Sequence, residues 1–283
     1  MDKFCDLHIH SVFSDGTCKP EEIIDEALKM GLSAVALTDH NTVDGLYDFT
    51  SYASDKNIDI APGVEFSTDY NGVELHILGL FMKQKYFSQV TELMEKLHLE
   101  KEKSNIRLIE SLRREGIILD YDEMKKLTPK GMINRAHVAE QMMKKGYTSS
   151  IKEGFEKYLG VSCGHYKIPK RLTASYTIDF IHSVGAVSVL AHPFLSLNEE
   201  GVLRFLNSPD SKGLNGMECY YSTNDDETTA KSLRIAERFS LIPSGGSDFH
   251  GERKPDITLG TGKGNLKIPY ECYIKLKEKA DNH

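Results

Sequence analysis

Short apolar runs alternate with amphipathic segments at both ends of the chain. The run at residues 34–38, Ala-Val-Ala-Leu-Thr, is typical of a strand buried on both faces. The pattern predicts strands at residues 4–9, 34–38, 58–66, 73–81, 186–191, 216–220 and 242–245. The pair Asn71-Gly72 marks a turn before the fourth of them.

Segments of helical periodicity separate most of these strands. Pro20 lies near the start of the first helix and Gly31 just past its end, which is the usual placement of these two residues. Thr42 is the expected N-cap of the second helix. The helices are predicted at residues 20–30, 43–55, 174–183, 199–206 and 225–239. Strands alternating with helices predict an α/β fold with a parallel sheet and crossover helices.

The alternation stops near Gln84 and resumes after Tyr158. The intervening segment is charged and helical in pattern, and its apolar stripes are the kind that pack helices together. Helices are expected there at residues 90–115, 120–127 and 134–145. We therefore predict a catalytic domain made of residues 1–83 and 159–283, interrupted by an inserted helical cap subdomain at residues 84–158.

Composition narrows the class of protein. The chain has 283 residues, 40% hydrophobic and 27% charged, with a net charge of -7, so it is expected to be globular and not to bind duplex nucleic acid or anionic membrane through bulk charge. It has no signal-peptide pattern and no apolar run of bilayer length. The five cysteines include no C-x-x-C pair. A cytoplasmic location is therefore expected.

Candidate chemistry starts with the stretch Asp6-Leu7-His8-Ile9-His10. Residues two apart on a strand share a face, so His8 and His10 can aim at one point. Other histidines and carboxylates follow at the ends of later strands, where parallel sheets build their sites. With Asp15 in the first loop and His76 inside a strand, the set comprises His8, His10, Asp15, His40, Glu65, His76, His192, Asp248 and His250.

These residue types predict a metal site. Imidazoles and carboxylates without thiolates suit Zn, Mn or Fe better than Mg or Ca. Nine ligands are too many for one ion with open positions, so two or three divalent ions are expected. Two metals about 3.5–4 Å apart can clamp a phosphoryl group and generate hydroxide at neutral pH. The predicted chemistry is phosphate ester hydrolysis by a metal-bound hydroxide.

The ordered motifs resemble the PHP (polymerase and histidinol phosphatase) superfamily along essentially the whole chain. They are His8-x-His10, Asp15-Gly16, Thr38-Asp39-His40-Asn41, Gly63-Val64-Glu65, His76, Ala191-His192-Pro193 and Gly246-Ser247-Asp248-x-His250. The resemblance implies a distorted seven-stranded TIM-like β/α barrel with a trinuclear site. It also implies a small bacterial phosphoesterase related to nucleoside 3',5'-bisphosphate phosphatases and 5'-3' exoribonucleases acting on short RNA.

The resemblance also implies how the ligands are shared. The first ion would take His8, His10, Glu65 and Asp248. The second would share Glu65 and add His76 and His192. The third would take Asp15, His40 and His250, with Asp15 standing where many relatives carry histidine. All nine residues are thus expected to be catalytic as metal ligands.

Substrate-binding residues are expected in the insertion. The segment Ile133-Asn134-Arg135-Ala136-His137-Val138-Ala139 is similar to the subgroup's Gly-Arg-Pro-His-Ile-Ala, with Asn134 and Ala136 in place of Gly and Pro. Arg135 and His137 are therefore candidates for binding a substrate phosphate near a helix start, where Arg forks onto phosphate well. Lys167 is a weaker candidate. Phe194, after His192-Pro193, is interpreted either as packing or as a platform for a base.

Alternatives remain at this point. The same site would suit a histidinol-phosphate phosphatase, although the insertion favours a small phosphorylated nucleotide or short oligonucleotide. A non-catalytic metal-binding PHP module is a further alternative, but such modules have usually lost ligands and none is missing here. The pattern leaves open the metal, the substrate, the oligomeric state and any lid motion of the insertion.

Overall fold

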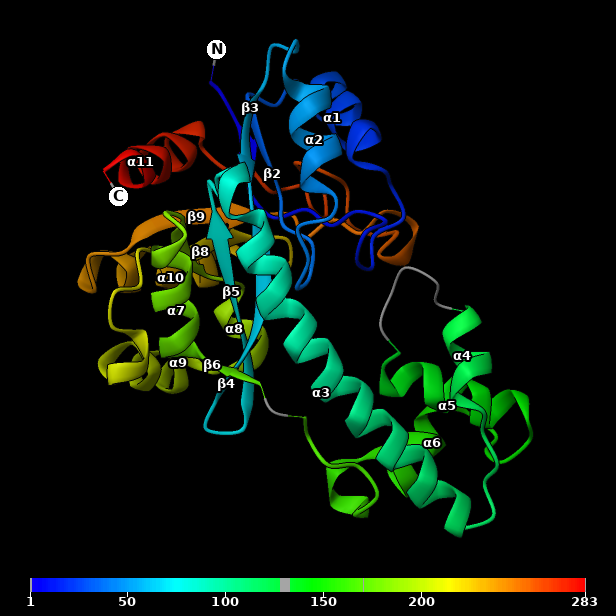
Figure 1. Ribbon diagram of the computed structural model, residues 1–283. Helices are drawn as coiled ribbons and strands as arrows, with labels where there is room; N and C mark the ends of the chain where they lie inside the picture. The colour runs from blue at the N-terminus through cyan, green and yellow to red at the C-terminus, as the bar shows by residue number, and fades with distance from the viewer. Residues whose placement is uncertain (1, 128–132, 170, 283) are drawn as a thin grey trace. The chain divides into compact units, whose positions relative to one another are not determined.

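The computed structural model describes residues 2–127, 133–169 and 171–282. The chain divides into two compact units (Figure 1). The first comprises Met1–Thr91 and Leu172–His283, and it contains the sheets. The second comprises Glu92–Arg171 and is built of helices. The predicted insertion at residues 84–158 overlaps most of this second unit.

The strands of the first unit form two sheets. Three parallel strands make the smaller sheet, in the order β1 (Cys5–Asp6), β2 (Ala34–Leu37) and β3 (Asp59–Pro62). The larger sheet has the order β6 (Leu172–Thr173), β4 (Val64–Tyr70), β5 (Val73–Leu80), β7 (Val187–Leu190), β8 (Gly216–Tyr221) and β9 (Ile242–Gly246). The predicted α/β class is confirmed.

The larger sheet is mixed, which corrects the expectation of a parallel sheet throughout. β5 runs antiparallel to both β4 and β7, whereas β6 with β4, β7 with β8, and β8 with β9 are parallel pairs. The reason is the tight turn at Asn71 and Gly72, whose φ angles are 53° and 83°. A turn this short can only join antiparallel neighbours.

The predicted strand 58–66 is in fact two strands, β3 and β4, which belong to different sheets. Gly63 stands between them, and a Cβ there would lie 2.7 Å from the carbonyl oxygen of Gly79. The close approach requires glycine, and the chain changes sheets at this position. Backbone hydrogen bonds also connect the sheets, including one of 3.1 Å from Leu7 N–H to the Gly245 carbonyl. Within the described residues, no single closed sheet forms.

The five helices predicted above for the first unit all form, with one change at a cap. α1 begins at Pro20 as predicted, but α2 begins at Leu46, after Gly45, and the Thr42 hydroxyl only accepts from Asp44 N–H in the preceding turn. Thr42 is therefore not the N-cap. The helices are α1 (Pro20–Lys29), α2 (Leu46–Ala53), α7 (Ala174–Ser183), α8 (Pro193–Ser196), α9 (Glu199–Asn207), α10 (Asp226–Arg238) and α11 (Tyr270–Asp281), with short 3-10 turns at Gln84–Tyr86, Pro209–Ser211 and Gly251–Arg253.

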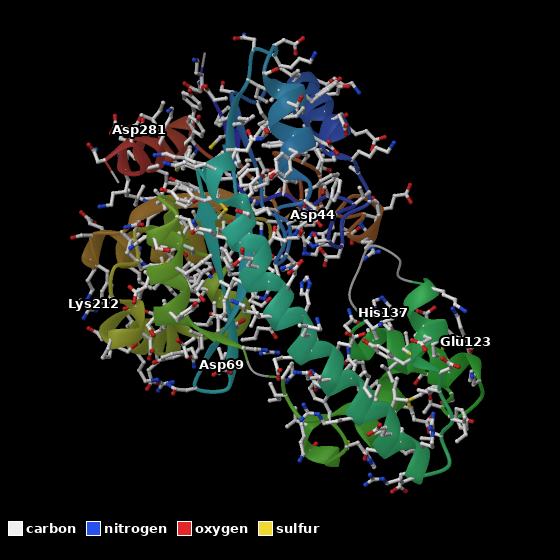
Figure 2. The ribbon with its side chains drawn as sticks, in the orientation of Figure 1. Asp44, Asp69, Glu123, His137, Lys212 and Asp281 are labelled. Carbon is white, nitrogen blue, oxygen red and sulfur yellow. The ribbon has the colours of Figure 1, made fainter. Side chains whose placement is uncertain are left out.

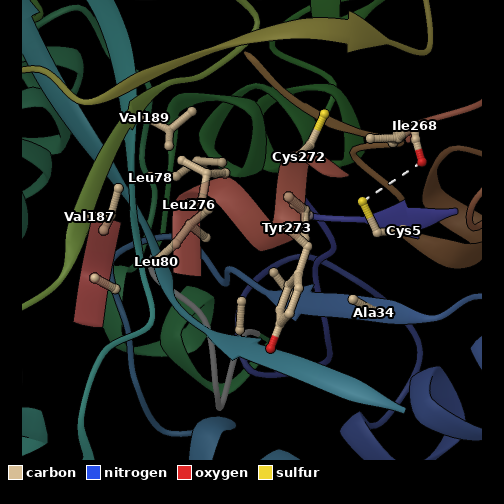
Figure 3. Packing of buried hydrophobic residues seen from close by; sticks show 14 of the residues in the cluster. Cys5, Ala34, Leu78, Leu80, Val187, Val189, Ile268, Cys272, Tyr273 and Leu276 are labelled. Carbon is tan, nitrogen blue, oxygen red and sulfur yellow. Dashed lines mark hydrogen bonds between the residues drawn. The ribbon is translucent and has the colours of Figure 1, made fainter. Parts of the chain in front are cut away.

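An apolar core anchors the strands under α11 (Figure 3). Ala34 of β2, Leu78 of β5, Val189 of β7 and Leu276 of α11 all belong to it and are fully buried. Burying a side chain such as leucine contributes about 2 kcal/mol to stability. The core therefore fixes the strands from which the candidate site residues extend.

The helical unit has a core of its own, which confirms that its apolar stripes pack its helices together. Leu108 and Leu112 of α3, Val138 and Met142 of α5, and Leu159 are all fully buried. Figure 2 labels Glu123 on α4 and His137 on α5. The elements are α3 (Phe87–Arg114), which starts within the first unit, then α4 (Tyr121–Leu127), α5 (Arg135–Lys144), α6 (Ile151–Gly154), a π-helical turn (Phe155–Leu159) and a 3-10 turn (Val161–Cys163).

Candidate metal centre

His8 and His10 lie just past the end of β1, and both are completely buried. Their Nε2 atoms are 3.1 Å apart. The two-residue period of an extended chain therefore brings both rings to one point, as predicted. Leu7 and Ile9, which alternate with them, are buried as well.

Glu65 is the central carboxylate of the site. It is the second residue of β4 and is completely buried. Its Oε1 and Oε2 atoms lie 2.7 to 3.2 Å from ring nitrogens of five histidines: His8, His10, His40, His76 and His192. One carboxylate thus joins imidazoles that come from five separate positions of the sequence.

Asp15 and His250 form another side of the same cluster. Asp15 Oδ1 lies 3.3 Å from His250 Nε2 and 3.6 Å from His10 Nδ1. The rings of His10 and His250 stack with their centroids 4.1 Å apart. The Asp15 side chain is 42% exposed, so this part of the cluster is open to solvent whereas Glu65 is not.

Asp248 turns its two carboxylate oxygens in different directions. Oδ1 lies 3.3 Å from His10 Nε2, toward the cluster. Oδ2 accepts hydrogen bonds from the Tyr221 hydroxyl at 2.7 Å and the Lys254 ammonium at 2.6 Å. The residue has a φ of 57°, in the left-handed region that costs energy for a side chain other than glycine. Such strain is typical of residues held in place at functional sites.

The carboxylates of the site favour positive charge at His10 and His76, whereas burial lowers the pKa of His40. Burial alone would lower the pKa of His10, but the nearby carboxylates of Asp248 and Glu65 outweigh it and raise the pKa to about 9. Burial likewise opposes the charged form of His76, yet the Glu65 charge raises that pKa to about 10. The surrounding imidazoles hold the pKa of the Glu65 carboxyl well below its usual range, against the effect of burial. The pocket therefore stabilises cations in a buried place.

The residues fit a metal centre by a separate criterion. His40 Nδ1 and Glu65 Oε2 are buried and 3.0 Å apart, but neither makes a hydrogen bond with acceptable geometry. Buried polar atoms without partners are rare, and a bound ion would satisfy both. Three overlapping groups have ligand atoms within 4.8 Å of one another: His10, Asp15, His40 and His250; His8, His10 and Glu65; and His40, Glu65 and His76.

Glu218 is a site residue that the sequence interpretation missed. It is completely buried on β8, where its Oε1 lies 3.0 Å from His8 Nδ1 and its Oε2 accepts the His192 backbone N–H at 2.6 Å. The carboxylate therefore fixes the ring of one candidate ligand and the backbone of another. A signal was available: an acidic residue inside an otherwise apolar strand must have a buried partner.

Replacing Glu218 with glutamine is expected to weaken metal binding by about 10- to 100-fold, because partners that orient ligating histidines typically have effects of that size. The amide removes the negative charge facing His8 Nδ1 but keeps the shape of the side chain. The metal dissociation constant would be measured by competition with a chromophoric chelator. Glu227, exposed on α10, provides the control variant Glu227→Gln. Equal affinities for Glu218→Gln and wild type would contradict the role assigned to Glu218.

Asp39 holds the loop that carries Asp15. Its carboxylate, 2% exposed, accepts from Ser11 N–H at 2.8 Å and from the hydroxyls of Ser11 and Ser14, both at 2.6 Å. Asp15 follows directly in the chain. The motif Thr38-Asp39-His40 thus supplies one candidate ligand and one residue that orders the loop.

The candidate substrate residues belong to the helical unit, whereas the nine candidate metal ligands belong to the first unit. Arg135 donates from Nη1 to the Leu159 carbonyl at 3.1 Å, and its guanidinium lies 4.3 Å from the centre of the Tyr166 ring. His137 Nδ1 accepts from Asn134 N–H as part of the α5 cap. Lys167 is exposed. Arg135 and His137 therefore make contacts within the helical unit itself.

A buried cluster of imidazoles and carboxylates at the strand ends of an α/β fold is typical of metal-dependent hydrolases. A family model described as the PHP domain matches residues 6–163, which is more than half of the chain. The chain belongs to the PHP domain family, and it is a metal-dependent phosphoesterase. The resemblance drawn from the motifs is confirmed.

Curated relatives align along nearly the whole chain. A 5'-3' exoribonuclease from Haemophilus influenzae is 31% identical over 251 residues, covering 88% of this chain and 91% of the relative. The 5'-3' exoribonuclease Rnm of Escherichia coli is 30% identical, covering 90% and 87%. A 3',5'-nucleoside bisphosphate phosphatase from Chromobacterium violaceum is 28% identical, covering 89% and 90%.

Solved structures share the fold. An amidohydrolase from Chromobacterium violaceum, determined with bound sulfate and no metal, superposes with a TM-score of 0.76 at 25% identity, covering 97% of this chain and 96% of that one. A candidate metal-dependent phosphoesterase from Bifidobacterium adolescentis gives 0.75 at 24% identity, covering 97% and 95%. Among the helices described here, none is both long and apolar enough to cross a bilayer.

Proposed function

We propose that this protein hydrolyses phosphate esters of small nucleotides, such as nucleoside 3',5'-bisphosphates or the 5' ends of short RNAs. The observation that supports it most is the buried Glu65 carboxylate, which five imidazoles surround. The cluster that they form is open to solvent on the side of Asp15. Relatives that align over most of their own length include exoribonucleases and a bisphosphate phosphatase, and these names support a nucleotide substrate.

The nine residues are proposed to hold two or three Mn, Zn or Fe ions. One set is His8, His10, Glu65 and Asp248, the second is Glu65, His76 and His192, and the third is Asp15, His40 and His250. When bound, such ions would activate water and neutralise charge on the phosphoryl oxygens. Glu65 holds the imidazoles around it in position. Tyr221 and Lys254 bind Oδ2 of Asp248, so that Oδ1 stays directed at the cluster.

Arg135 and His137, with Lys167 as a weaker candidate, are proposed to bind a second phosphate of the substrate. A guanidinium has five N–H donors, and one of those of Arg135 is used on the Leu159 carbonyl. We also propose that the helical segment acts as a cap inserted into the catalytic domain, and that strands from both sheets together correspond to the distorted seven-stranded TIM-like β/α barrel.

Metal removal provides the test. Purified protein supplied with Mn is expected to release phosphate from adenosine 3',5'-bisphosphate, and to lose essentially all of this activity when EDTA is added, because the ions carry the chemistry. A 5'-phosphorylated short RNA and a generic aryl phosphate would be assayed in parallel. Turnover of the aryl phosphate alone would discard the nucleotide substrates, and release that persists in EDTA would contradict the metal centre.

A further inference from the structure

A hollow of about 180 Å³ lies beside the metal centre in the first unit. His192 and Tyr221 line it on the side of the centre. Phe194 and Leu195 of α8 provide apolar surface, while Asn224 and Thr228 provide polar groups. None of these residues has a role in the chemistry proposed above except His192 and Tyr221.

The hollow and the metal centre share a wall. The rings of His192 and Tyr221 lie with their centroids 5.4 Å apart. His192 Nε2 is 2.9 Å from Glu65, and the Tyr221 hydroxyl is 2.7 Å from Asp248. The hollow is therefore within reach of a molecule whose phosphate is held at the centre.

The backbone turns sharply at His192, between the metal centre and the segment that carries Phe194. His192 has a φ of 24° and a ψ of 58°, values that a residue with a side chain rarely adopts. The chain turns sharply there as it leaves β7, and Pro193 starts the single turn of α8. Phe194, two residues after His192, lines the same hollow as His192.

The lining suits a flat heteroaromatic ring. Phe194 is half-buried, and the neighbouring Leu195 is 57% exposed, which leaves apolar surface open to solvent. Asn224 donates from Nδ2 to the Cys219 carbonyl at 3.2 Å, and within the described residues its Oδ1 has no donor. An aromatic face with a nearby amide acceptor is a combination that binds nucleobases by stacking and by edge hydrogen bonds.

We propose that this hollow binds the base of a nucleotide substrate, with Phe194 stacking on it and Asn224 contacting its edge. The proposal rests on the proposed function and names the part of the protein that would make it prefer nucleotides over simple phosphate esters. Base–aromatic stacking is typically worth enough to change binding by about 10-fold or more.

The test removes the base and the ring in turn. The substrates are adenosine 3',5'-bisphosphate and its abasic analogue, in which hydrogen replaces the base. For the wild-type protein, loss of the base is expected to raise KM by about 10-fold. For Phe194→Ala, the same loss from the substrate is expected to raise KM far less, because the stacking partner is already gone. Phe194→Tyr, which keeps a ring, is expected to restore the wild-type pattern.

Two further variants make the result decisive. Phe194→Leu keeps apolar volume but lacks the ring, so it replaces the alanine variant if that one fails to fold. Tyr176→Ala removes a half-exposed ring that does not line the hollow, and it should retain the full penalty for base removal. An equal penalty in wild type and in the variants without a ring would overturn the proposal, as would the absence of a penalty in wild type. Wild-type protein that hydrolyses neither bisphosphate, yet cleaves an aryl phosphate, would instead refute the nucleotide function itself, and the base site with it.

Discussion

Replacing Glu65 with glutamine is expected to lower kcat for every phosphate ester by about 1000-fold or more. The substitution keeps the size of the side chain but removes its charge, and the amide nitrogen cannot accept a hydrogen bond or ligate a metal. Both oxygens of Glu65 face imidazoles in the native protein. A metal centre contributes several kcal/mol of transition-state stabilisation, and each 1.4 kcal/mol corresponds to a factor of ten in rate.

The measurement is turnover of an aryl phosphate together with metal content by mass spectrometry. Far-ultraviolet circular dichroism would show that Glu65→Gln remains folded. Glu26→Gln is the matched control, because the Glu26 side chain on α1 is 45% exposed and forms a surface ion pair with Lys29. If Glu65→Gln bound metal and turned over substrate as the wild type does, Glu65 would not be the central ligand and the proposed arrangement of ions would be wrong.

The sequence was sufficient to predict that the candidate ligands lie near one another, because strand geometry is local. His8 and His10 converge because successive residues of an extended chain alternate between faces. His40 and His192 follow the buried runs that become β2 and β7. Parallel strands end at a common edge, so residues at those ends become neighbours without any knowledge of long-range packing.

The sequence was not sufficient for features that depend on contacts between distant segments. Glu218 contacts His8, which is 210 positions away in the chain, and a local sequence pattern cannot predict such a pair. The mixed direction of the larger sheet depends on β5 returning from the Asn71-Gly72 turn and then pairing with β7, which follows the helical insertion. The start of α2 at Leu46 could not be predicted from the preference of threonine for N-caps, because Thr42 belongs to a turn before the helix.

Gly246 shows how closely two such distant segments approach. It ends β9, and a Cβ at this position would lie 2.1 Å from His8 Cβ and 2.7 Å from His8 N. Separations below 3 Å require atoms to move, and here the obstructing atoms include backbone. The next residues hold the same contact, since Asp248 N–H donates to the His8 carbonyl at 2.9 Å. Any added side-chain atom would therefore push β9 away from His8.

Gly246→Ala is accordingly expected to destabilise the protein by about 3 kcal/mol and to weaken metal binding, because overpacking of this kind costs 1–3 kcal/mol or more. Urea denaturation of the metal-free protein would give the stability, and chelator competition the affinity. The matched control is Gly154→Ala in α6, where the nearest atom to an added Cβ is Ala139 Cβ at an ordinary 3.4 Å. That variant is expected to stay within about 0.5 kcal/mol of wild type. A Gly246→Ala protein as stable as the control would mean that β9 does not pack against His8, and the ligand geometry at the first ion would then have to be rebuilt.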